Sequence, residues 1–366
     1  MNLLKKFLSY VFMYGLQRTA VKALYKFDND VSYLILRMMF SVKSQEKTRI
    51  VFVGLGNHGF TLLAFFVSVI ARHRISLVID PSPKSQQLAT KVLKCQHYID
   101  IESAIADGVF FGDIIYIASD HLSHTPHAIV AADNFRRVYV EKPLFVNSKQ
   151  MSDFWEIYDS SCDLYTGFNR PYSPLFKEFI HNLSDDFLVT MVINGHFLSA
   201  EHWYRVEGQG SRVLGNLTHW IDLAVHIFMI KPGLSIVNIE LTKGRLDDLV
   251  LILTSGAKKI CLSFSANCEP SDGVEEYIFW NCSASIGRIL NFRKMHYVTK
   301  DGATRKVNRL TKDVGHKAAA LAPLYALDQD ARIAYISSAL AIKVEEMYLD
   351  DTTSSHFNLE KLLRKI

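Results

Sequence analysis

Gly-Leu-Gly-Asn-His-Gly, at residues 54–59, is the most informative stretch of the sequence. It follows an apolar, β-rich segment at residues 49–54 and precedes an apolar segment at residues 60–71 that has the length of a buried helix. Three glycines in the pattern G-x-G-x-x-G between a strand and a helix are typical of a dinucleotide-binding turn. The pattern therefore predicts a strand, a phosphate-binding turn and a helix in succession.

Each glycine of this turn has its own physical task. Gly54 allows a tight turn, Gly56 lets a pyrophosphate approach the backbone, and Gly59 brings the helix close to the strand. The first turn of the helix then offers free N–H groups and a partial positive charge to the phosphates. The other turn residues that we expect at the cofactor are Asn57 and His58.

An acidic residue follows at the spacing that such a site requires. Asp80 ends the next predicted strand, residues 75–80, and lies 21 residues after Gly59. A carboxylate there accepts hydrogen bonds from the ribose 2′-hydroxyl and repels a 2′-phosphate. The sequence thus favours NAD as the cofactor over NADP.

Strands and helices alternate from Thr48 to about residue 170, which predicts a parallel sheet covered on both faces. Beyond about residue 185, strands follow one another with short turns, and a helical stretch over about residues 317–349 closes the pattern. These later strands are expected over residues 187–197, 235–242, 248–254, 259–264, 275–281 and 286–292. The predicted fold class is α/β, with an N-terminal Rossmann domain at residues 48–170 and a C-terminal α+β domain at 171–366. The second domain is expected to carry a large, mostly antiparallel open sheet.

Residues 1–47 form a basic N-terminal extension. They hold eight Lys/Arg and three Asp/Glu, a local charge of +5, so that the remaining chain carries 4 − 5 = −1. A nucleic-acid-binding protein would be expected to have a basic face on its folded body. The charge distribution therefore argues against nucleic acid as a partner.

The extension begins with an amphipathic segment, and two interpretations of it remain open. Its apolar face is formed by Leu3, Leu4, Phe7, Leu8, Val11 and Phe12. One interpretation is a helix that packs on its own protein or on a sister subunit. The other is peripheral membrane contact through residues 1–26, driven by the apolar face and the basic residues on anionic lipid.

The spacing of cysteines and histidines, together with the length of the apolar runs, argues against disulfides, membrane spans and metal sites. Five cysteines, an odd number without a C-x-x-C pair, favour a reducing compartment, and we expect the cytoplasm. No apolar run reaches the ~18–20 residues that span a membrane. The 14 histidines include no H-E-x-x-H or other ligand spacing, so we expect no metal.

Several further motifs occur in a fixed order along the chain. They are Ser-Asp-His-Leu-Ser-His at 119–124, Glu-Lys-Pro at 141–143, Gly-Phe-Asn-Arg at 167–170, Asn-Gly-His at 194–196, Glu-His-Trp-Tyr at 201–204 and Asn-Leu-Thr-His-Trp-Ile-Asp at 216–222. Together with the glycine turn and Asp80, they resemble the glucose–fructose oxidoreductase / inositol dehydrogenase (Gfo/Idh/MocA) family over about residues 48–350.

The resemblance implies roles for particular residues. Lys142 would polarise the reacting oxygen and stabilise negative charge on it, and His219 would exchange the hydroxyl proton. Substrate contacts would come from Asn169, Arg170, Trp203 and Asp222, and further cofactor contacts from Ser119, His124 and Glu141. One feature departs from the family: many members have an acidic residue three or four positions before the histidine, where this chain has Asn216 and Gly215.

The expected function is that of an NAD-dependent oxidoreductase acting on a hydroxyl or keto carbon of a sugar, nucleotide sugar or cyclitol. The substrate class follows from the resemblance alone. Two alternatives remain open: a sugar epimerase or lyase that retains its NAD, and a non-catalytic NAD-binding sensor or assembly protein. The resemblance also implies a homo-oligomer that contacts its copies through the open sheet.

Overall fold

The structure, a computed structural model, describes residues 3–41, 48–158, 161–229, 236–245, 247–270 and 273–363. The side chains of residues 3–8, which include most of the predicted apolar face, lie outside this description, as do residues 1, 2, 42–47, 235 and 364–366 of the predicted segments. The described chain forms two compact units. The first contains residues 15–167 and 316–331, and the second contains 1–14, 168–315 and 332–366.

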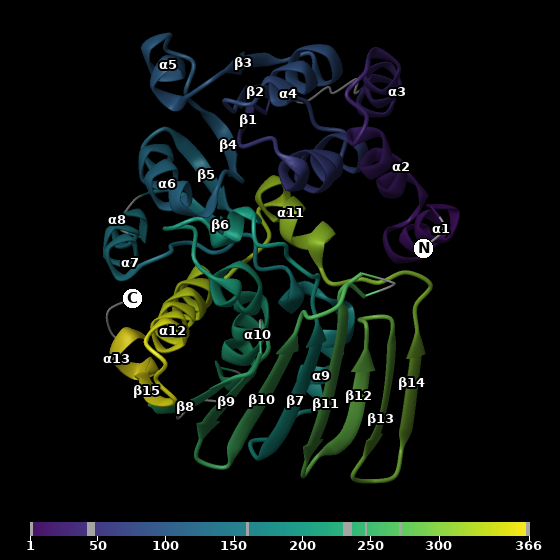
Figure 1. Ribbon diagram of the computed structural model, residues 1–366, viewed down its shortest axis with the longest axis vertical. Helices are drawn as coiled ribbons and strands as arrows, with labels where there is room; N and C mark the ends of the chain where they lie inside the picture. The colour runs from purple at the N-terminus through teal and green to yellow at the C-terminus, as the bar shows by residue number, and fades with distance from the viewer. Residues whose placement is uncertain are drawn as a thin grey trace. The chain divides into compact units, whose positions relative to one another are not determined.

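The first unit is built on a six-stranded parallel sheet in the order β3-β2-β1-β4-β5-β6 (Figure 1). This order confirms the predicted Rossmann fold. The strands are β1 (Ile50–Val53), β2 (Ile75–Ile79), β3 (Gln96–Tyr98), β4 (Gly112–Ile117), β5 (Phe135–Val140) and β6 (Asp163–Thr166). The inner strands are almost wholly apolar because helices cover both of their faces.

The helices of this unit follow the strands in the alternation that the sequence predicts. They are η1 (Gly59–Ile70), α4 (Pro83–Gln87), η2 (Leu88–Leu93), α5 (Ile101–Ala106), η3 (His121–Ser123), α6 (His124–Ala132), α7 (Ser148–Asp153) and α8 (Trp155–Tyr158). A further helix, α11 (His316–Tyr325), returns from late in the chain and packs on η1. The Tyr116 hydroxyl donates to the Ala320 carbonyl at 2.8 Å, which fixes α11 to β4.

Two helices of the extension, α2 (Leu16–Tyr25) and α3 (Asp30–Phe40), pack on the first unit. Val21 and Leu36 are fully buried in its core, and the Phe40 ring stacks on Phe60 with centroids 4.8 Å apart. Helix α1 (Leu3–Tyr14) belongs to the second unit, where Met13 lies against Gly273. The described part of the extension therefore packs on its own protein.

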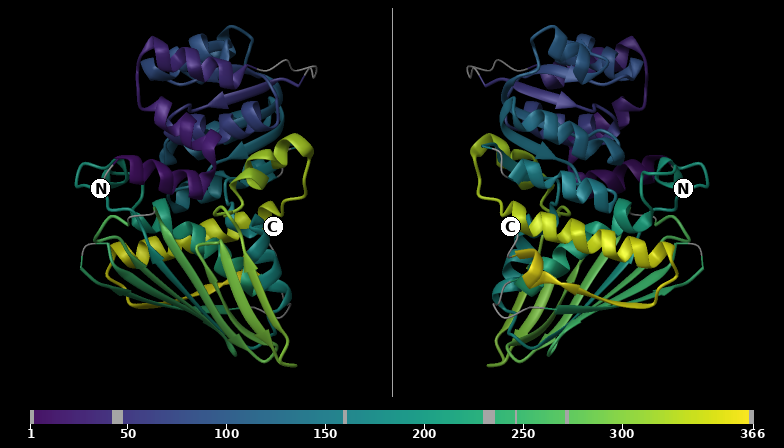
Figure 2. Two further views of the ribbon diagram at one scale, coloured as in Figure 1. Left: turned by 90° about the vertical axis from the view of Figure 1, so that its right-hand side faces the viewer. Right: turned by 90° about the vertical axis from the view of Figure 1, so that its left-hand side faces the viewer.

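The second unit is built on a nine-stranded sheet in the order β14-β13-β12-β11-β7-β10-β9-β8-β15 (Figure 1). Every neighbouring pair is antiparallel except β7 and β10, which confirms the mostly antiparallel sheet. In Figure 2 its strands fan out with the twist expected of a large sheet. The strands are β7 (Phe187–Asn194), β8 (Ile236–Lys243), β9 (Leu249–Ser255), β10 (Lys258–Ser265), β11 (Glu275–Cys282), β12 (Ser285–Leu290), β13 (Lys294–Thr299), β14 (Thr304–Asn308) and β15 (Ser354–Asn358).

Helices cover one face of this sheet. Phe179 of α9 packs on Trp280 with ring centroids 4.8 Å apart, and Phe228 of α10 packs on Phe187 at 6.1 Å. On β7, burial alternates strictly, so the opposite face carries side chains that are at least partly exposed. The helices of the unit are η4 (Arg170–Tyr172), α9 (Pro174–His181), η5 (Trp203–Arg205), η6 (Val213–Leu217), α10 (Thr218–Met229), α12 (Ala331–Leu349) and α13 (Leu359–Leu363).

The predicted helical stretch over about residues 317–349 is divided into two helices, α11 and α12. The chain leaves α11 at Ala326, whose φ of +48° is left-handed, and enters α12 only at Ala331. Between them, the Gln329 side chain accepts a hydrogen bond from the Thr166 backbone N–H at 2.9 Å and donates to the Thr166 hydroxyl at 2.8 Å. These contacts tie the segment between α11 and α12 to the end of β6.

Candidate functional site

The glycine turn after β1 has the geometry of a phosphate cradle. Gly54 has a φ of +87°, and a Cβ added to it would lie 2.4 Å from the Ala118 carbonyl oxygen. A Cβ on Gly59 would lie 2.5 Å from the Gly54 carbonyl oxygen, so both positions exclude larger residues. Gly56 has no atom within 4 Å of its added Cβ, and Asn57 beside it is exposed. The turn is thus closed toward the sheet and open on the side where a pyrophosphate would approach.

Asp80 joins the turn to the loop after β2. Its buried carboxylate accepts hydrogen bonds from the backbone N–H of Leu55 at 2.7 Å and of Ser82 at 2.8 Å. An ionised carboxylate has about four acceptor sites. Asp80 therefore retains acceptor capacity for ribose hydroxyls while it holds both loops in place.

Glu141, predicted at the cofactor, has partners within the protein. Its carboxylate contacts His58 Nε2 at 3.0 Å and accepts a hydrogen bond from the Tyr139 hydroxyl at 2.9 Å. Burial opposes its ionisation, but His58 and Lys142 outweigh burial and lower the pKa of Glu141 to about 2. A Cβ on Gly167 would lie 2.4 Å from Glu141 Oε2, so the Gly167 position leaves room for this buried anion.

Lys142 follows Glu141 at the end of β5 and is half-buried, and its peptide bond to Pro143 is cis. The buried His124 ring contacts the loop that follows Lys142. Its Nδ1 lies 2.7 Å from the Pro143 carbonyl oxygen, and its Nε2 lies 3.2 Å from the Ser119 carbonyl oxygen. Burial lowers the pKa of His124, which favours a neutral ring. The Ser119 hydroxyl lies 3.1 Å from His127 Nδ1. His124 and Ser119 thus contact the protein around the Lys142 loop.

His219 and Asp222 lie in the first turns of α10. His219 is half-buried, whereas Asp222 is 1% exposed and accepts a hydrogen bond from the Ser337 hydroxyl at 2.8 Å. His226 Nε2 lies 3.7 Å from the same carboxylate. Burial outweighs the opposing effects of Ser337 and Arg170 and raises the pKa of Asp222 to about 8. A carboxyl group in this state is mostly protonated at neutral pH.

Asn169 and Arg170 are both buried and bound to their own unit. The Asn169 side-chain amide donates to the Val314 carbonyl at 2.5 Å. Arg170 Nε pairs with Glu276 at 2.6 Å, and Lys312 pairs with the other Glu276 oxygen at 2.5 Å. Burial acts against the charge on Glu276, but the two cations hold its pKa below the ordinary value. The two residues predicted to contact substrate are therefore engaged in internal contacts.

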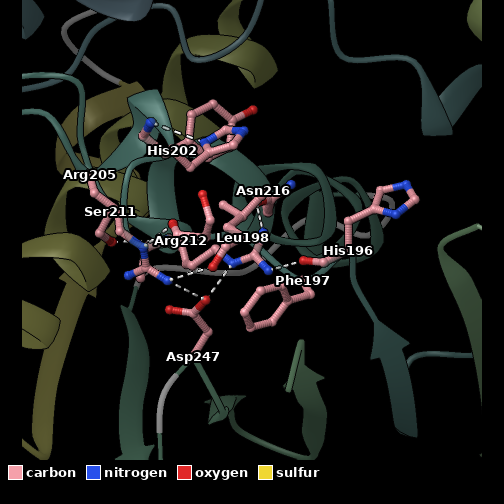
Figure 3. A network of polar contacts seen from close by, with 12 residues as sticks. His196, Phe197, Leu198, His202, Arg205, Ser211, Arg212, Asn216 and Asp247 are labelled. Atoms are coloured by element: carbon pink, nitrogen blue, oxygen red, sulfur yellow. Dashed lines mark hydrogen bonds and ion pairs between the residues drawn. The ribbon is translucent and has the colours of Figure 1, made fainter. Parts of the chain in front are cut away.

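A polar network fixes the loop before α10 (Figure 3). Arg212, which is almost fully buried, donates to Asp247 at 3.1 Å, to the Asn216 side chain at 2.7 Å and to the His196 carbonyl. Arg205 donates to the same Asp247 oxygen at 3.0 Å. The network orients Asn216, which lies one turn before His219.

Trp203 and Tyr204 lie in the loop that this network holds. The Trp203 side chain is 42% exposed, and its ring packs edge-on against Tyr204 with centroids 4.3 Å apart. A Cβ on Gly215 would lie 2.4 Å from the Tyr204 ring, and the Tyr204 hydroxyl donates to the Gly215 carbonyl at 3.3 Å. An aromatic ring therefore fills the space beside Gly215, which is one of the two positions, with Asn216, where the resemblance leads us to expect an acidic residue.

Sequence reasoning did not identify several of these partners. The missed residues are Tyr139, Tyr204, Arg205, Arg212, Asp247, Glu276, Lys312 and Ser337. Two of them had a signal in the sequence: Tyr204 belongs to the Glu-His-Trp-Tyr motif at 201–204, and Arg212 is a basic residue at the end of the short glycine-rich segment 208–212.

Within the ranges that the structure describes, we find no group of three or more His, Cys, Asp or Glu side chains arranged to hold a metal ion. In the same part of the chain, no helix combines the length and the hydropathy that crossing a bilayer requires.

The fold and the glycine turn define a protein with a dinucleotide-binding unit and a large antiparallel-sheet unit. Residues 48–166 match the model of the GFO_IDH_MocA oxidoreductase family, NAD-binding Rossmann fold, which confirms the predicted resemblance. The match covers the first unit without the extension and without residues 316–331, which include α11. No curated protein matches the sequence.

Solved structures match over most of the chain. GenD2 from gentamicin A biosynthesis, in complex with NAD, is 16% identical, with 87% of this chain and 99% of that chain covered and a TM-score of 0.68. A protein from Sinorhizobium meliloti, provisionally assigned as a myo-inositol dehydrogenase, is 18% identical, with coverages of 86% and 100% and a TM-score of 0.66. One from Desulfitobacterium hafniense, provisionally assigned as NADPH-dependent, is 10% identical, with coverages of 87% and 100% and a TM-score of 0.69. These similarities show a shared fold.

Proposed function

We propose that the protein is an NAD-dependent oxidoreductase that acts on a hydroxyl or keto carbon of a sugar, nucleotide sugar or cyclitol. The observation that carries the proposal is the cradle formed by Gly54, Gly56 and Gly59 together with Asp80. Its open side suits a pyrophosphate, and the Asp80 carboxylate suits ribose hydroxyls. The neighbour with bound NAD and the provisional inositol dehydrogenase support the cofactor and the substrate class.

Two residues would carry the chemistry. The bound nicotinamide would supply or accept hydride. The Lys142 ammonium would stabilise negative charge on the reacting oxygen, and the half-buried His219 would take or return its proton. Because Asp222 is mostly protonated at neutral pH, a neutral carboxyl group would lie three residues after His219. Trp203 would offer an exposed ring to the C–H face of a carbohydrate.

The test is a panel of sugars, nucleotide sugars and cyclitols, with NAD reduction followed by its near-ultraviolet absorbance. We expect turnover with at least one substrate. Lys142→Ala and His219→Ala should each lower kcat by about a hundredfold or more, with NAD still bound. The exposed Lys149→Ala and His181→Ala serve as matched controls that keep full activity.

Two results would replace this proposal with an alternative. Conversion of substrate without net NAD reduction would indicate an epimerase or lyase that retains its cofactor. NAD binding with no conversion of any panel member, unaffected by either substitution, would indicate a sensor or assembly protein.

We further propose a homo-oligomer formed through the open face of the nine-stranded sheet. Four large apolar side chains on that face are at least two-fifths exposed, namely Leu188, Val250, Phe279 and Ile286. An apolar patch of this kind is typical of a protein interface.

We also propose that the outer side of α3 contacts an anionic lipid surface. Val31, Leu34 and Met38 follow a helical spacing and are 68%, 57% and 64% exposed. Arg37 on the same helix and the +5 charge of residues 1–47 complement anionic headgroups. This places the contact on α3 in addition to the predicted residues 1–26.

We place the protein in the cytoplasm, because its five cysteines are free thiols.

A further inference from the structure

Tyr25, the last residue of α2, packs on two helices of the first unit. Its ring stacks on Phe60 with centroids 5.7 Å apart, and Lys84 Nζ lies 4.2 Å from its centroid. Phe60 is in η1 and Lys84 is in α4. A residue from outside the matched family region therefore contacts both helices at their first turns.

These two helices follow the two loops of the nucleotide cradle. Phe60 N–H donates to the Gly56 carbonyl at 2.9 Å, so Phe60 is fixed to the glycine turn. Helix α4 begins at Pro83, directly after Ser82, whose N–H donates to Asp80 at 2.8 Å. Movement of either helix start would shift the groups expected to meet the adenosine ribose.

The charges around Tyr25 agree with this placement. Burial raises the pKa of Tyr25, and the negative charge of Asp80 raises it further, so the phenol lies within electrostatic reach of that carboxylate. Lys84 contacts the ring face, where a cation is attracted by the ring quadrupole.

We propose that Tyr25 is a positioning residue of the cofactor site, so that the extension forms part of the adenosine end of that site. The contact with Phe60 fixes the glycine turn, and the contact with Lys84 fixes the loop that carries Asp80. The proposal rests on the proposed function only in requiring that the protein binds NAD.

The experiment measures the Kd of the full-length protein for NAD and for ADP-ribose by calorimetry. Tyr25→Ala and Lys84→Met should each raise both values by about three- to tenfold, while Tyr25→Phe, which keeps the ring, stays near wild type. Where a substrate is in hand, KM for NAD should rise with kcat unchanged. Lys91→Met is the matched control: Lys91 Nζ lies 5.5 Å from the Tyr33 ring of α3, but Lys91 is in η2, away from Asp80.

The outcomes separate this proposal from the proposed function. Wild type that binds neither ligand contradicts both. Wild type that binds NAD, with Lys84→Met and Lys91→Met equal to it, overturns the role of Tyr25 alone. If Tyr25→Ala does not fold, the two lysine variants decide the question by the same comparison. Each removes one cation that contacts an aromatic ring of the extension, and Lys91→Met also removes the ion pair with Asp30 of α3 at 2.8 Å. Equal weakening by both lysine variants would indicate a general effect on extension packing and would also overturn the proposal.

Discussion

At Asp80, one carboxylate both shapes the cradle and sets its charge. Its oxygens bind the backbone N–H groups of Leu55 and Ser82, and we expect its carboxylate to meet the ribose of the cofactor. A 2′-phosphate would be repelled there. Asp80→Asn keeps the size of the side chain and one acceptor oxygen but loses the charge. Asp80→Ala loses the charge and both acceptor oxygens.

We expect Asp80→Asn to raise the affinity for NADP relative to NAD by about tenfold, and Asp80→Ala to weaken NAD binding as well. Titration of each variant with NAD and NADP gives both constants. Wild type that already prefers NADP, as the provisional assignment of one structural neighbour would imply for that protein, would contradict this reading of Asp80.

Residue types and spacing were sufficient to predict the glycine turn and Asp80, because the groups involved lie close together in sequence. The partners of Arg170 and Asp222 were not predictable in this way. Glu276 is 106 residues from Arg170, and Ser337 is 115 residues from Asp222. A single sequence carries no record of such pairings, so it does not show that Asn169 and Arg170, predicted to contact substrate, also have internal partners.

At the scale of elements, Asp222 joins α10 to α12 through Ser337. Its pKa is raised to about 8, from an ordinary value of 3.8. The folded protein therefore holds this proton more tightly than the unfolded chain does. The stability that this bound proton contributes is fully present below the pKa of Asp222 in the unfolded chain. It is lost as pH rises through about 8, the pKa of Asp222 in the folded protein.

Asp222→Asn removes this titration while keeping a similar shape. We expect the free energy of unfolding of the wild type to fall relative to the variant as pH rises from about 4 to 8. Urea unfolding at several pH values measures the difference. A constant difference across this range would mean that Asp222 does not titrate there.

Most strands with apolar alternation were predictable, but β13 (Lys294–Thr299) was missed although it alternates, and the outer strands were missed as well. β14 (Thr304–Asn308) holds an Arg and a Lys and only one apolar residue, and β15 (Ser354–Asn358) holds one large apolar residue. Edge strands need only one partner and commonly carry charge, so their sequences resemble loops. The break between α11 and α12 was missed for a related reason, since its decisive contact is between Gln329 and Thr166, far apart in sequence.

At the scale of the whole molecule, two exposed apolar surfaces can be tested against each other. We expect Leu34→Glu with Met38→Glu to abolish co-sedimentation with phosphatidylserine vesicles and to leave the molar mass unchanged. Leu188→Glu with Phe279→Glu should lower the molar mass by light scattering and leave vesicle binding unchanged. Each double variant is thus the control for the other.

Three results would contradict these surface assignments. Negligible vesicle binding by wild type would exclude the lipid contact of α3. A monomeric wild type would exclude the homo-oligomer. A change of molar mass in the α3 variant would show that this helix meets a second copy of the chain instead of lipid.

The packing of Tyr204 on Gly215 restricts the order in which this chain could change. Since a Cβ at position 215 would meet the tyrosine ring at 2.4 Å, an acidic residue there requires that the Tyr204 ring moves or is replaced by a smaller side chain. Shortening Tyr204 first passes through a packed intermediate with a cavity, whereas changing Gly215 first passes through a steric clash. The side chains that positions 204 and 215 can hold are therefore coupled: a Tyr204→Ala variant should accept Gly215→Asp at a smaller cost in stability than the wild type does.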